Sequence, residues 1–362
     1  MFKSSLEILQ KIVDNGFSAY IVGGFVRDYI MKIDSVDVDI CTDATPKDLL
    51  NIFNDAILPK EKYGAVTLKY QNLRVEITTF RKELKYENRK PVEIEYTNSL
   101  EEDIKRRDFT INSLCMDKDG VIVDLFNGRK DIDKKIIMTL GDPDEKFTED
   151  PLRILRAVRF ATTLNFKLDE SVINSIKSNA HYLLNISYDR KKSELNKIFA
   201  SKNIKYGIKL LNSLGLDKYL DLSNLNNIKY TSDIFGIWAI LDVCDKYPFT
   251  KLERETIGTI QTIVKNKTIS KYDIYKYGLY STSIAAEILG INKKVIVKLE
   301  RNLKIRSRND INISASEILS MFNKEPGAWV SNIYNDVELR IINGKLKNDN
   351  DKIKDYIVRN YM

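Results

Sequence analysis

Residues 17–41 read FSAYIVGGFVRDYIMKIDSVDVDIC, and this stretch changes pattern twice. Phe17–Val22 is a short apolar run that predicts a strand, and two glycines at 23 and 24 end it. Phe25–Met31 predicts a helix directly after the glycines, and Val36–Cys41 alternates apolar and acidic residues as a second strand does. The stretch therefore predicts a strand–turn–helix–strand unit at the start of an α/β or α+β domain.

The polar residues of this unit suit a nucleotide bound together with a divalent cation. Glycines at a strand end, such as Gly24, let backbone amides approach phosphates, and the next helix begins there with its positive dipole end. Arg27 adds a forked donor for phosphate oxygens. Asp37 and Asp39 point to one face of a strand, need a counter-cation, and offer the hard oxygen ligands that Mg²⁺ prefers. The alternative is a tight turn beside a strand with solvated acids.

Two further positions could belong to the same site. Glu76 lies on an apolar segment, Leu73–Phe80, that forms a predicted hairpin with Tyr63–Tyr70. It is either a third acidic ligand or an exposed strand glutamate, and the sequence favours neither. Arg107 precedes an apolar run, where adjacent arginines usually indicate a solvated face; beside a phosphate site it becomes a candidate to hold a triphosphate tail.

A helix predicted over Glu149–Asn165 carries a third group, Asp150, Arg153, Arg156 and Arg159. Asp150 and Arg153 would lie about 60° apart on it, which in its plain interpretation is an i,i+3 ion pair. The sharper interpretation is base recognition. Cytosine and adenine both present an amino donor beside a ring-nitrogen acceptor, so an aspartate that accepts and an arginine that donates would take either base. Uracil and guanine would meet mismatched groups.

The rest of the chain divides by pattern and by charge. Arg81–Pro91 is charged and aperiodic, which predicts a mobile loop, and after residue 143 almost every segment has helical spacing. The predicted fold is α+β, a head with a small mixed sheet followed by an elongated helical part. Residues 1–150 hold 23 Lys/Arg and 29 Asp/Glu, whereas the remainder holds 35 and 22. An acidic first part suits cations, and a basic second part suits a polyanion.

Composition excludes several classes of protein and mechanism. No apolar run approaches the roughly 20 residues of a membrane span, and the N-terminus reads as an amphipathic helix rather than a signal peptide. Three widely spaced cysteines argue against a disulfide framework or a zinc site and favour the reducing cytoplasm. His181 is the only histidine, so a mechanism with two imidazoles is excluded.

Five motifs follow one another between Tyr20 and Phe166: GGFVRD, DVD, RRDFTIN, DLFNGRKD and EDPLRILRAVRF. In this order they resemble the class II tRNA nucleotidyltransferases, the CCA-adding enzymes of the polymerase β superfamily. SYDRKKSEL at 187–195 resembles the family's fifth motif. KIRSRNDINISASEIL and NKEPGAWVSNIYNDVE resemble the tails of the shorter enzymes of Gram-positive bacteria.

The resemblance implies untemplated transfer of CMP, CMP and AMP from CTP and ATP onto the tRNA 3′ end, with Mg²⁺ and release of pyrophosphate. It implies a head (1–140), a neck (141–205), a helical body (206–300) and a helical tail that binds tRNA (301–362). It assigns metal binding to Asp37 and Asp39, and nucleotide binding to Gly24, Arg27, Arg107, Asp150, Arg153, Arg156 and Arg159. Residues 124–131 would act as a hinge, and Arg190 and Glu194 would support the neck helix.

Several activities share these motifs. CC-adding members are shortened in the loop before RRDFT, and that loop is present here as Arg81–Pro91. An A-adding enzyme of a split system keeps every motif and stays the alternative. A poly(A) polymerase usually shows GRRF where this chain has EKYGAV, and a silent RNA-binding protein would be expected to lack Asp37 and Asp39. A phosphohydrolase domain would need histidines that 237–246 do not contain, and the sequence does not decide whether the chain forms a homodimer.

Overall fold

The computed structural model describes residues 2–35, 37–58, 64–71, 73–87, 90–229, 231–322 and 324–362. The chain divides into two compact units, one up to Leu222 and one from Ser223 onward. Every helix among the described residues is too short or too polar to cross a membrane.

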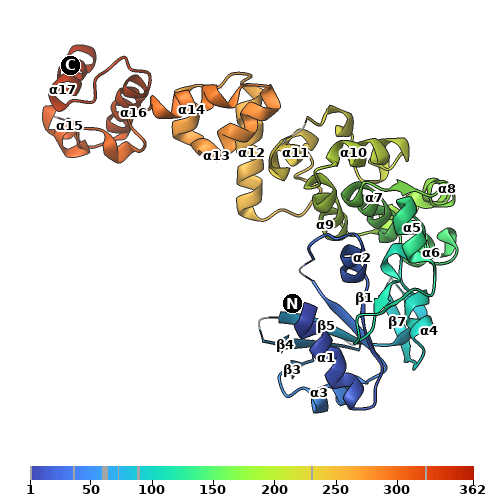
Figure 1. Cartoon of the computed structure of the whole chain (residues 1–362). Helices are drawn as coiled ribbons and strands as arrows, with labels where there is room; N and C mark the ends of the chain where they lie inside the picture. Colours follow the sequence, from blue (N-terminus) through green and yellow to red (C-terminus); the bar gives the residue numbers. More distant parts are fainter. Residues whose placement is uncertain are drawn as a thin grey trace. The chain divides into compact units, whose positions relative to one another are not determined.

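The first unit contains a mixed sheet with the strand order β3-β4-β5-β2-β1-β8-β9 (Figure 1). Strands β2 and β5 run parallel, and the other neighbouring pairs are antiparallel. The strands are β1 Ala19–Val22, β2 Asp39–Thr42, β3 Ala56–Ile57, β4 Ala65–Tyr70, β5 Leu73–Thr79, β8 Cys115–Met116 and β9 Ile122–Val123. The predicted order of strand, glycine turn, helix and strand is confirmed, and so is the hairpin of β4 and β5.

Local chemistry explains the helices beside this sheet. Helix α1 (Phe2–Asp14) turns Ile8, Leu9 and Ile12 inward, fully buried, and packs against β1. Helix α3 (Pro46–Ile52) begins with proline in its first turn, and Thr45 caps it in a reciprocal capping box with Asp48. The remaining helical segments up to Lys134 are α2 Gly24–Ile30, α4 Leu100–Lys105, the 3₁₀ turn η1 Thr110–Asn112 and α5 Gly128–Lys134.

Helices dominate the first unit after residue 140. They are α6 Pro143–Glu149, α7 Leu152–Leu164, α8 Glu170–Asn179, η2 Ala180–Asn185, α9 Tyr188–Phe199, α10 Ile204–Ser213 and η3 Asp217–Tyr219. A short parallel pair, β10 (Ile136–Ile137) and β11 (Lys167–Leu168), joins the start of this part to the end of α7.

Two predictions of local structure are wrong. The segment Arg81–Pro91 is not a loop: β6 (Arg81–Glu87) pairs antiparallel with β7 (Lys90–Tyr96), although residues 88 and 89 lie outside the described residues. The helix predicted from Glu149 is interrupted, because Asp150 ends α6 with extended dihedral angles and α7 begins only at Leu152. Pro151 explains the interruption, since a proline disfavours helical geometry in the residue before it.

The segment 124–131 is a closed turn packed on η1. The carboxylate of Asp124 accepts hydrogen bonds from the backbone N–H groups of Gly128 (2.9 Å) and Arg129 (3.0 Å). A Cβ atom at Gly128 would lie 2.2 Å from the carbonyl oxygen of Thr110, so only glycine fits there. These contacts pack the segment against η1, and its role as a hinge stays a prediction.

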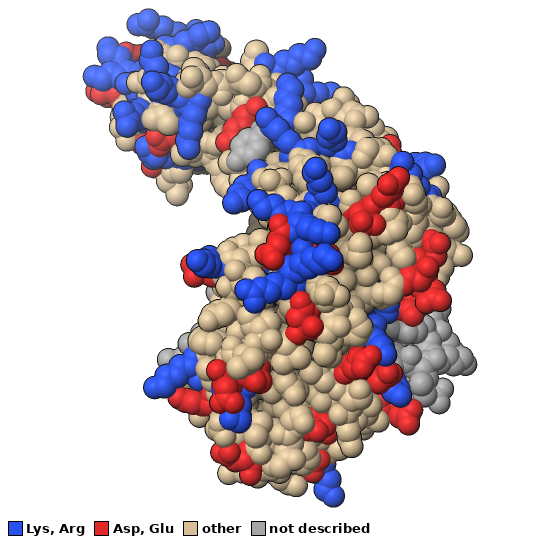
Figure 2. Space-filling model, turned by 45° about the vertical axis from the view of Figure 1, so that its right-hand side comes forward, with Lys and Arg blue, Asp and Glu red and all other residues tan. Residues whose placement is uncertain are grey.

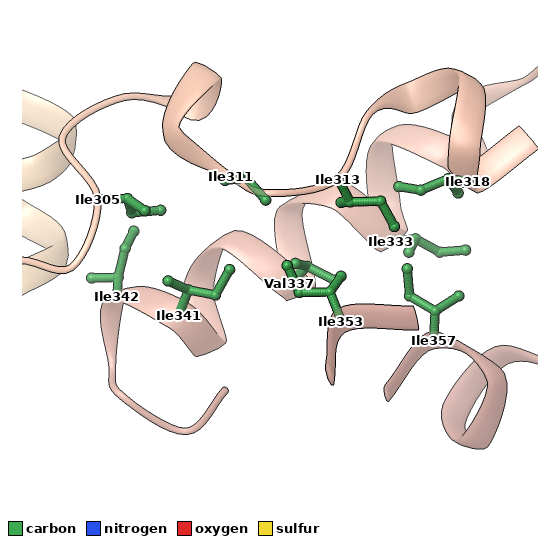
Figure 3. Close-up of a cluster of buried hydrophobic side chains, with 10 residues drawn as sticks. All are labelled: Ile305, Ile311, Ile313, Ile318, Ile333, Val337, Ile341, Ile342, Ile353 and Ile357. Carbon is green, nitrogen blue, oxygen red and sulfur yellow. The ribbon is translucent and has the colours of Figure 1, made fainter. Parts of the chain in front are cut away.

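The second unit is helical, as the sequence predicts for this part of the chain. Its helical segments are η4 Leu225–Asn227, α11 Ile234–Leu241, α12 Lys251–Lys265, α13 Lys271–Leu289, α14 Lys293–Arg301, η5 Arg308–Asp310, α15 Ala315–Met321, α16 Ala328–Ile342 and α17 Asn350–Tyr361. Figure 3 shows the core of its C-terminal end, in which isoleucines from α15, α16 and α17 meet those of the loop before α15.

Candidate functional site

Three carboxylates meet at the start of β2. Asp39 opens this strand and pairs in register with Glu76 on β5, and Asp37 lies two residues before it. Asp37 and Asp39 are exposed while Val38 between them is 4% exposed, which puts the two acids on the same side of the chain. The strand begins later than predicted, because β2 starts at Asp39 and Asp37 precedes it, while Val36 lies outside the described residues. None of the three carboxylates forms a hydrogen bond or ion pair with another residue that the structure describes.

The charges at this strand end favour a cation. Desolvation by the surrounding protein and the negative charges of Glu76 and Asp37 raise the pKa of Asp39, and Arg107 only partly opposes them. No three His, Cys, Asp or Glu side chains among the described residues enclose a metal ion by themselves. A pair of carboxylates with open positions nevertheless fits a divalent ion that takes water and substrate phosphates as its other ligands.

Two arginines lie close to the glycine turn that follows β1, near the start of β2. Gly23 has a φ of 78°, a left-handed conformation that favours glycine, and its N–H donates to the carbonyl of Leu114 (3.2 Å). A Cβ atom on Gly23 would lie 3.8 Å from Nη1 of Arg107, and one on Gly24 would lie 3.7 Å from Nη2 of Arg27. Predicted phosphate-binding residues from two distant motifs therefore line one turn.

Arg107 has one side-chain donor to spare. Its Nη2 donates to the buried carboxylate of Asp103 (3.2 Å), which fixes the guanidinium. Its Nε is buried and finds no hydrogen-bond partner among the described residues. A buried donor without a partner costs about 1–3 kcal/mol, so a nearby negative charge would stabilise this guanidinium, whose Nη1 lies beside the glycine turn.

Three further guanidinium groups surround the ring of Phe160 on α7. Their central carbons lie 5.3 Å (Arg27), 5.5 Å (Arg156) and 4.1 Å (Arg159) from the ring centroid. The negative face of an aromatic ring attracts cations, which helps to hold these like charges together. We call Arg27, Arg156, Arg159 and Phe160 the arginine cluster.

Buried acids compensate part of this charge. Arg156 forms an ion pair with Asp108, with its Nε 2.6 Å from the carboxylate, and Arg159 pairs with Glu194 on α9 at 3.2 Å. Burial alone would raise the pKa of Asp108, but the charge of Arg156 lowers it. Burial lowers the pKa of Arg159 to about 10; Glu194 opposes this shift, and Arg156 and Arg27 add to it. Arg27 pairs with Asp28 at 2.7 Å, so each arginine of the cluster has one carboxylate partner. Because Arg159 is also destabilised by burial and by two neighbouring cations, the cluster is a candidate anion site.

The predicted base-reading pair is arranged differently from the prediction. Because the helix is interrupted, Asp150 precedes α7, although its carbonyl still accepts from the N–H of Arg153 (2.9 Å). The side chains of the two residues form ion pairs with other residues. Asp150 accepts from Nη2 of Arg190 on α9 (2.9 Å). Arg153 is 7% exposed and donates to Glu149 (2.5 Å) and to the carbonyls of Lys146 (3.0 Å) and Arg106 (3.2 Å).

These contacts join the predicted site residues of the head and of α7. Arg153 reaches the carbonyl of Arg106, next to Arg107, and Arg156 reaches Asp108, while Arg107 itself lies beside the glycine turn and influences Asp39. Sequence reasoning missed the parts played by Asp108, Asn112 and Phe160. The signal was present, since all three lie within motifs already singled out, but their partners are distant in sequence.

Comparisons with known proteins point in one direction. Residues 19–138 match a family described as "Poly A polymerase head domain", and residues 242–357 match one described as "tRNA nucleotidyltransferase domain 2". A CCA-adding enzyme of Staphylococcus epidermidis is 32% identical over 99% of this chain and 98% of its own length. One of Ligilactobacillus salivarius is 34% identical over 96% and 94%.

A solved structure agrees with these relatives. The crystal structure of the Bacillus stearothermophilus CCA-adding enzyme in complex with CTP superposes with a TM-score of 0.89. It is 27% identical and covers 99% of this chain and 97% of its own.

The arginine cluster predicts a specific stability effect. Glu194→Ala removes the buried partner of Arg159 and leaves a desolvated cation beside two others, so the free energy of unfolding should fall by about 3–5 kcal/mol. Glu101→Ala removes an exposed partner of Lys105 on α4 and should change it by less than about 1 kcal/mol. Chemical denaturation of both variants measures the difference; equal effects would contradict the charge balance described above.

Proposed function

The chain belongs to the family of CCA-adding enzymes, and we propose that it adds C, C and A to the 3′ end of tRNA without a nucleic-acid template. In each step the terminal 3′-hydroxyl attacks the α-phosphate of CTP or ATP. A new phosphodiester bond forms, the bond between the α- and β-phosphates breaks, and pyrophosphate leaves with the electron pair. The hydroxyl proton passes to solvent or to a nearby carboxylate.

Asp37 and Asp39 would hold Mg²⁺, with Glu76 as the third acidic group beside them. When bound, Mg²⁺ stabilises the charge that develops on the attacking and leaving oxygens. The shared face of Asp37 and Asp39, and the raised pKa of Asp39, support this assignment. Glu76 pairs in register with Asp39 on the neighbouring strand, which supports its interpretation as a third acidic group of the site rather than as an unrelated exposed glutamate.

Gly24, Arg27 and Arg107 would bind the triphosphate. The glycines leave room for a ligand to approach the backbone of the turn, and the guanidinium groups of Arg107 and Arg27 lie beside it. The buried Nε of Arg107 supports its role most directly, because a phosphate oxygen would satisfy this donor.

Asp150 and Arg153 would select the base. Each oxygen of the Asp150 carboxylate can accept more than one hydrogen bond, so it can hold Arg190 and still accept from the amino group of cytosine or adenine. Glu149 and two backbone carbonyls fix the guanidinium of Arg153 and limit its rotation. Arg156 and Arg159 would complete the nucleotide pocket with the positive charge of the arginine cluster.

One observation carries this proposal. Side chains of α7 form hydrogen bonds with Arg106 and Asp108, and Arg107 between them acts on the pKa of Asp39 at the proposed metal site. We assign the catalytic head to residues 1–140, the base-recognising neck to 141–205, the body to 206–300 and the tRNA-binding tail to 301–362. Figure 2 supports a polyanion partner, because Lys and Arg side chains crowd the visible face of the C-terminal end.

The metal assignment predicts a separation of binding from chemistry. Asp37→Ala combined with Asp39→Ala should reduce nucleotide incorporation by more than about 10³-fold, because removal of a single electrostatic contact already costs about 10²–10³. Affinity for tRNA should change little, since these acids do not bind its backbone. Incorporation of radiolabelled nucleotide and a tRNA-binding titration measure the two effects, with Asp133→Asn on the exposed face of α5 as control. Wild-type activity in the double variant would refute the assignment.

The choice between full CCA addition and A addition needs a substrate series. We expect the purified protein to add C to tRNA that ends at the discriminator base, C to tRNA ending in -C, and A to tRNA ending in -CC. Radiolabelled CTP or ATP supplied singly with each tRNA identifies the product. Incorporation of A alone, and only onto the -CC end, would instead identify an A-adding enzyme.

A further inference from the structure

The side-chain amide of Asn112 lies between the guanidinium of Arg27 and the carboxylate of Asp108, next to the arginine cluster. Its Oδ1 accepts from Nη1 of Arg27 at 2.7 Å, and its Nδ2 donates to Oδ1 of Asp108 at 3.2 Å. All three residues are buried, with 7–8% of their surface exposed. The amide therefore replaces water for both charged neighbours.

The polarity of this amide matches its two neighbours in only one orientation. The oxygen must face the guanidinium, which has donors only, and the nitrogen must face the ionised carboxylate, which has acceptors only. Asp108 in turn holds Arg156. A continuous chain of hydrogen bonds thus runs from Arg27 on α2, through Asn112 and Asp108, to Arg156 on α7.

This chain of hydrogen bonds holds together two groups that repel each other. Arg27 and Arg156 both lie within 5.5 Å of the Phe160 ring centroid. Asp28 also binds Arg27, but it lies on the same short helix and fixes the guanidinium only relative to α2. Arg27 also contacts the ring of Phe160 on α7, but that contact has no fixed direction; among the described hydrogen bonds, those of Asn112 and Asp108 relate the position of Arg27 to α7.

The backbone that carries Asn112 is itself held in place. Its N–H donates to the carbonyl of Phe109 (3.0 Å), and Thr110, two residues earlier, donates through Oγ1 to Asp131 (2.6 Å). Gly128 is packed so closely on the carbonyl of Thr110 that no Cβ atom fits. The amide therefore cannot readily follow its partners if one of them moves.

We propose that Asn112 is a positioning residue that sets the spacing of Arg27 and Arg156 around the nucleotide. The inference rests on the proposed function of those two arginines as nucleotide ligands. Loss of the amide leaves Asp108 and Arg27 without a shared partner, and the two guanidinium groups move apart. Asp150 and Arg153 keep their own partners, Arg190 and Glu149, so the choice of base is unaffected.

Steady-state kinetics on tRNA ending in -C and in -CC tests this role. Asn112→Ala should lower kcat/KM for CTP and for ATP by about 10- to 100-fold each, mainly through KM, as expected when hydrogen bonds to charged groups are lost. The preference for CTP over UTP should stay as in the wild type. Asn179→Ala is the matched control: Asn179 is 8% exposed and donates to Asp144 at 2.6 Å, outside the arginine cluster, and its loss should leave both constants unchanged.

A second variant separates positioning from packing. Asn112→Asp has the same size and keeps the acceptor for Arg27, but at about pH 8 it places a second carboxylate against Asp108. If the amide only filled space, this variant would work as the wild type; we expect the same rise in KM as for Asn112→Ala. Thermal unfolding of each variant shows whether a loss of activity follows from a loss of stability. If Asn112→Ala does not fold, the kinetics of Asn112→Asp alone test the positioning role.

Three results would overturn the inference: unchanged KM values in Asn112→Ala, wild-type kinetics in Asn112→Asp, or an equal loss in Asn179→Ala. A change in CTP-over-UTP preference as large as the change in KM would also overturn it, because the amide would then act on base selection. Failure of the wild type to add any nucleotide would contradict the proposed function instead, and the wild-type reaction is measured alongside.

Discussion

The crowding of three guanidinium groups around Phe160 is the constraint on which the first unit depends. Like charges at such distances repel strongly in a poorly solvated site, and no single interaction holds them. The aromatic ring contributes its negative face, Asp108 and Glu194 contribute buried carboxylates, and each acid comes from a different segment of the chain. Keeping the cluster together therefore requires α2, the segment 106–112, α7 and α9 to be packed against one another.

The first unit also contains two groups of charged residues of opposite sign, the carboxylates at the start of β2 and the arginine cluster. Burial and the neighbouring carboxylates raise the pKa of Asp39, and burial and the neighbouring arginines lower the pKa of Arg159, so the charged form of each group is destabilised. Arg107 lies between them, bound to Asp103 and acting on Asp39. A divalent cation would stabilise the ionised form of Asp39, and phosphate groups would stabilise the charged form of Arg159, as the proposed nucleotidyl transfer requires.

Local patterns in the sequence predicted what short-range physics controls. The alternation around Val38 placed Asp37 and Asp39 on one face, and the glycines ended β1 where expected. The interrupted helix at Asp150 could have been recognised from Pro151. Strand β6 could not be recognised from alternation, because its sequence is dominated by charge and it pairs only with β7, outside the main sheet. The partners of Asp150 and Arg159 lie about 40 residues away on α9, and no local pattern specifies them.

The most direct test concerns the proposed role of Asp150 in selecting the incoming base. The ratio of kcat/KM for CTP to that for UTP, measured on tRNA ending in -C, reports how strongly the side chain rejects the wrong base. Asp150→Ala should lower this ratio by about 10- to 100-fold, since a well-placed base contact contributes about 1–3 kcal/mol of discrimination. An unchanged ratio in a folded variant would contradict this role, because the incoming base would then be selected elsewhere.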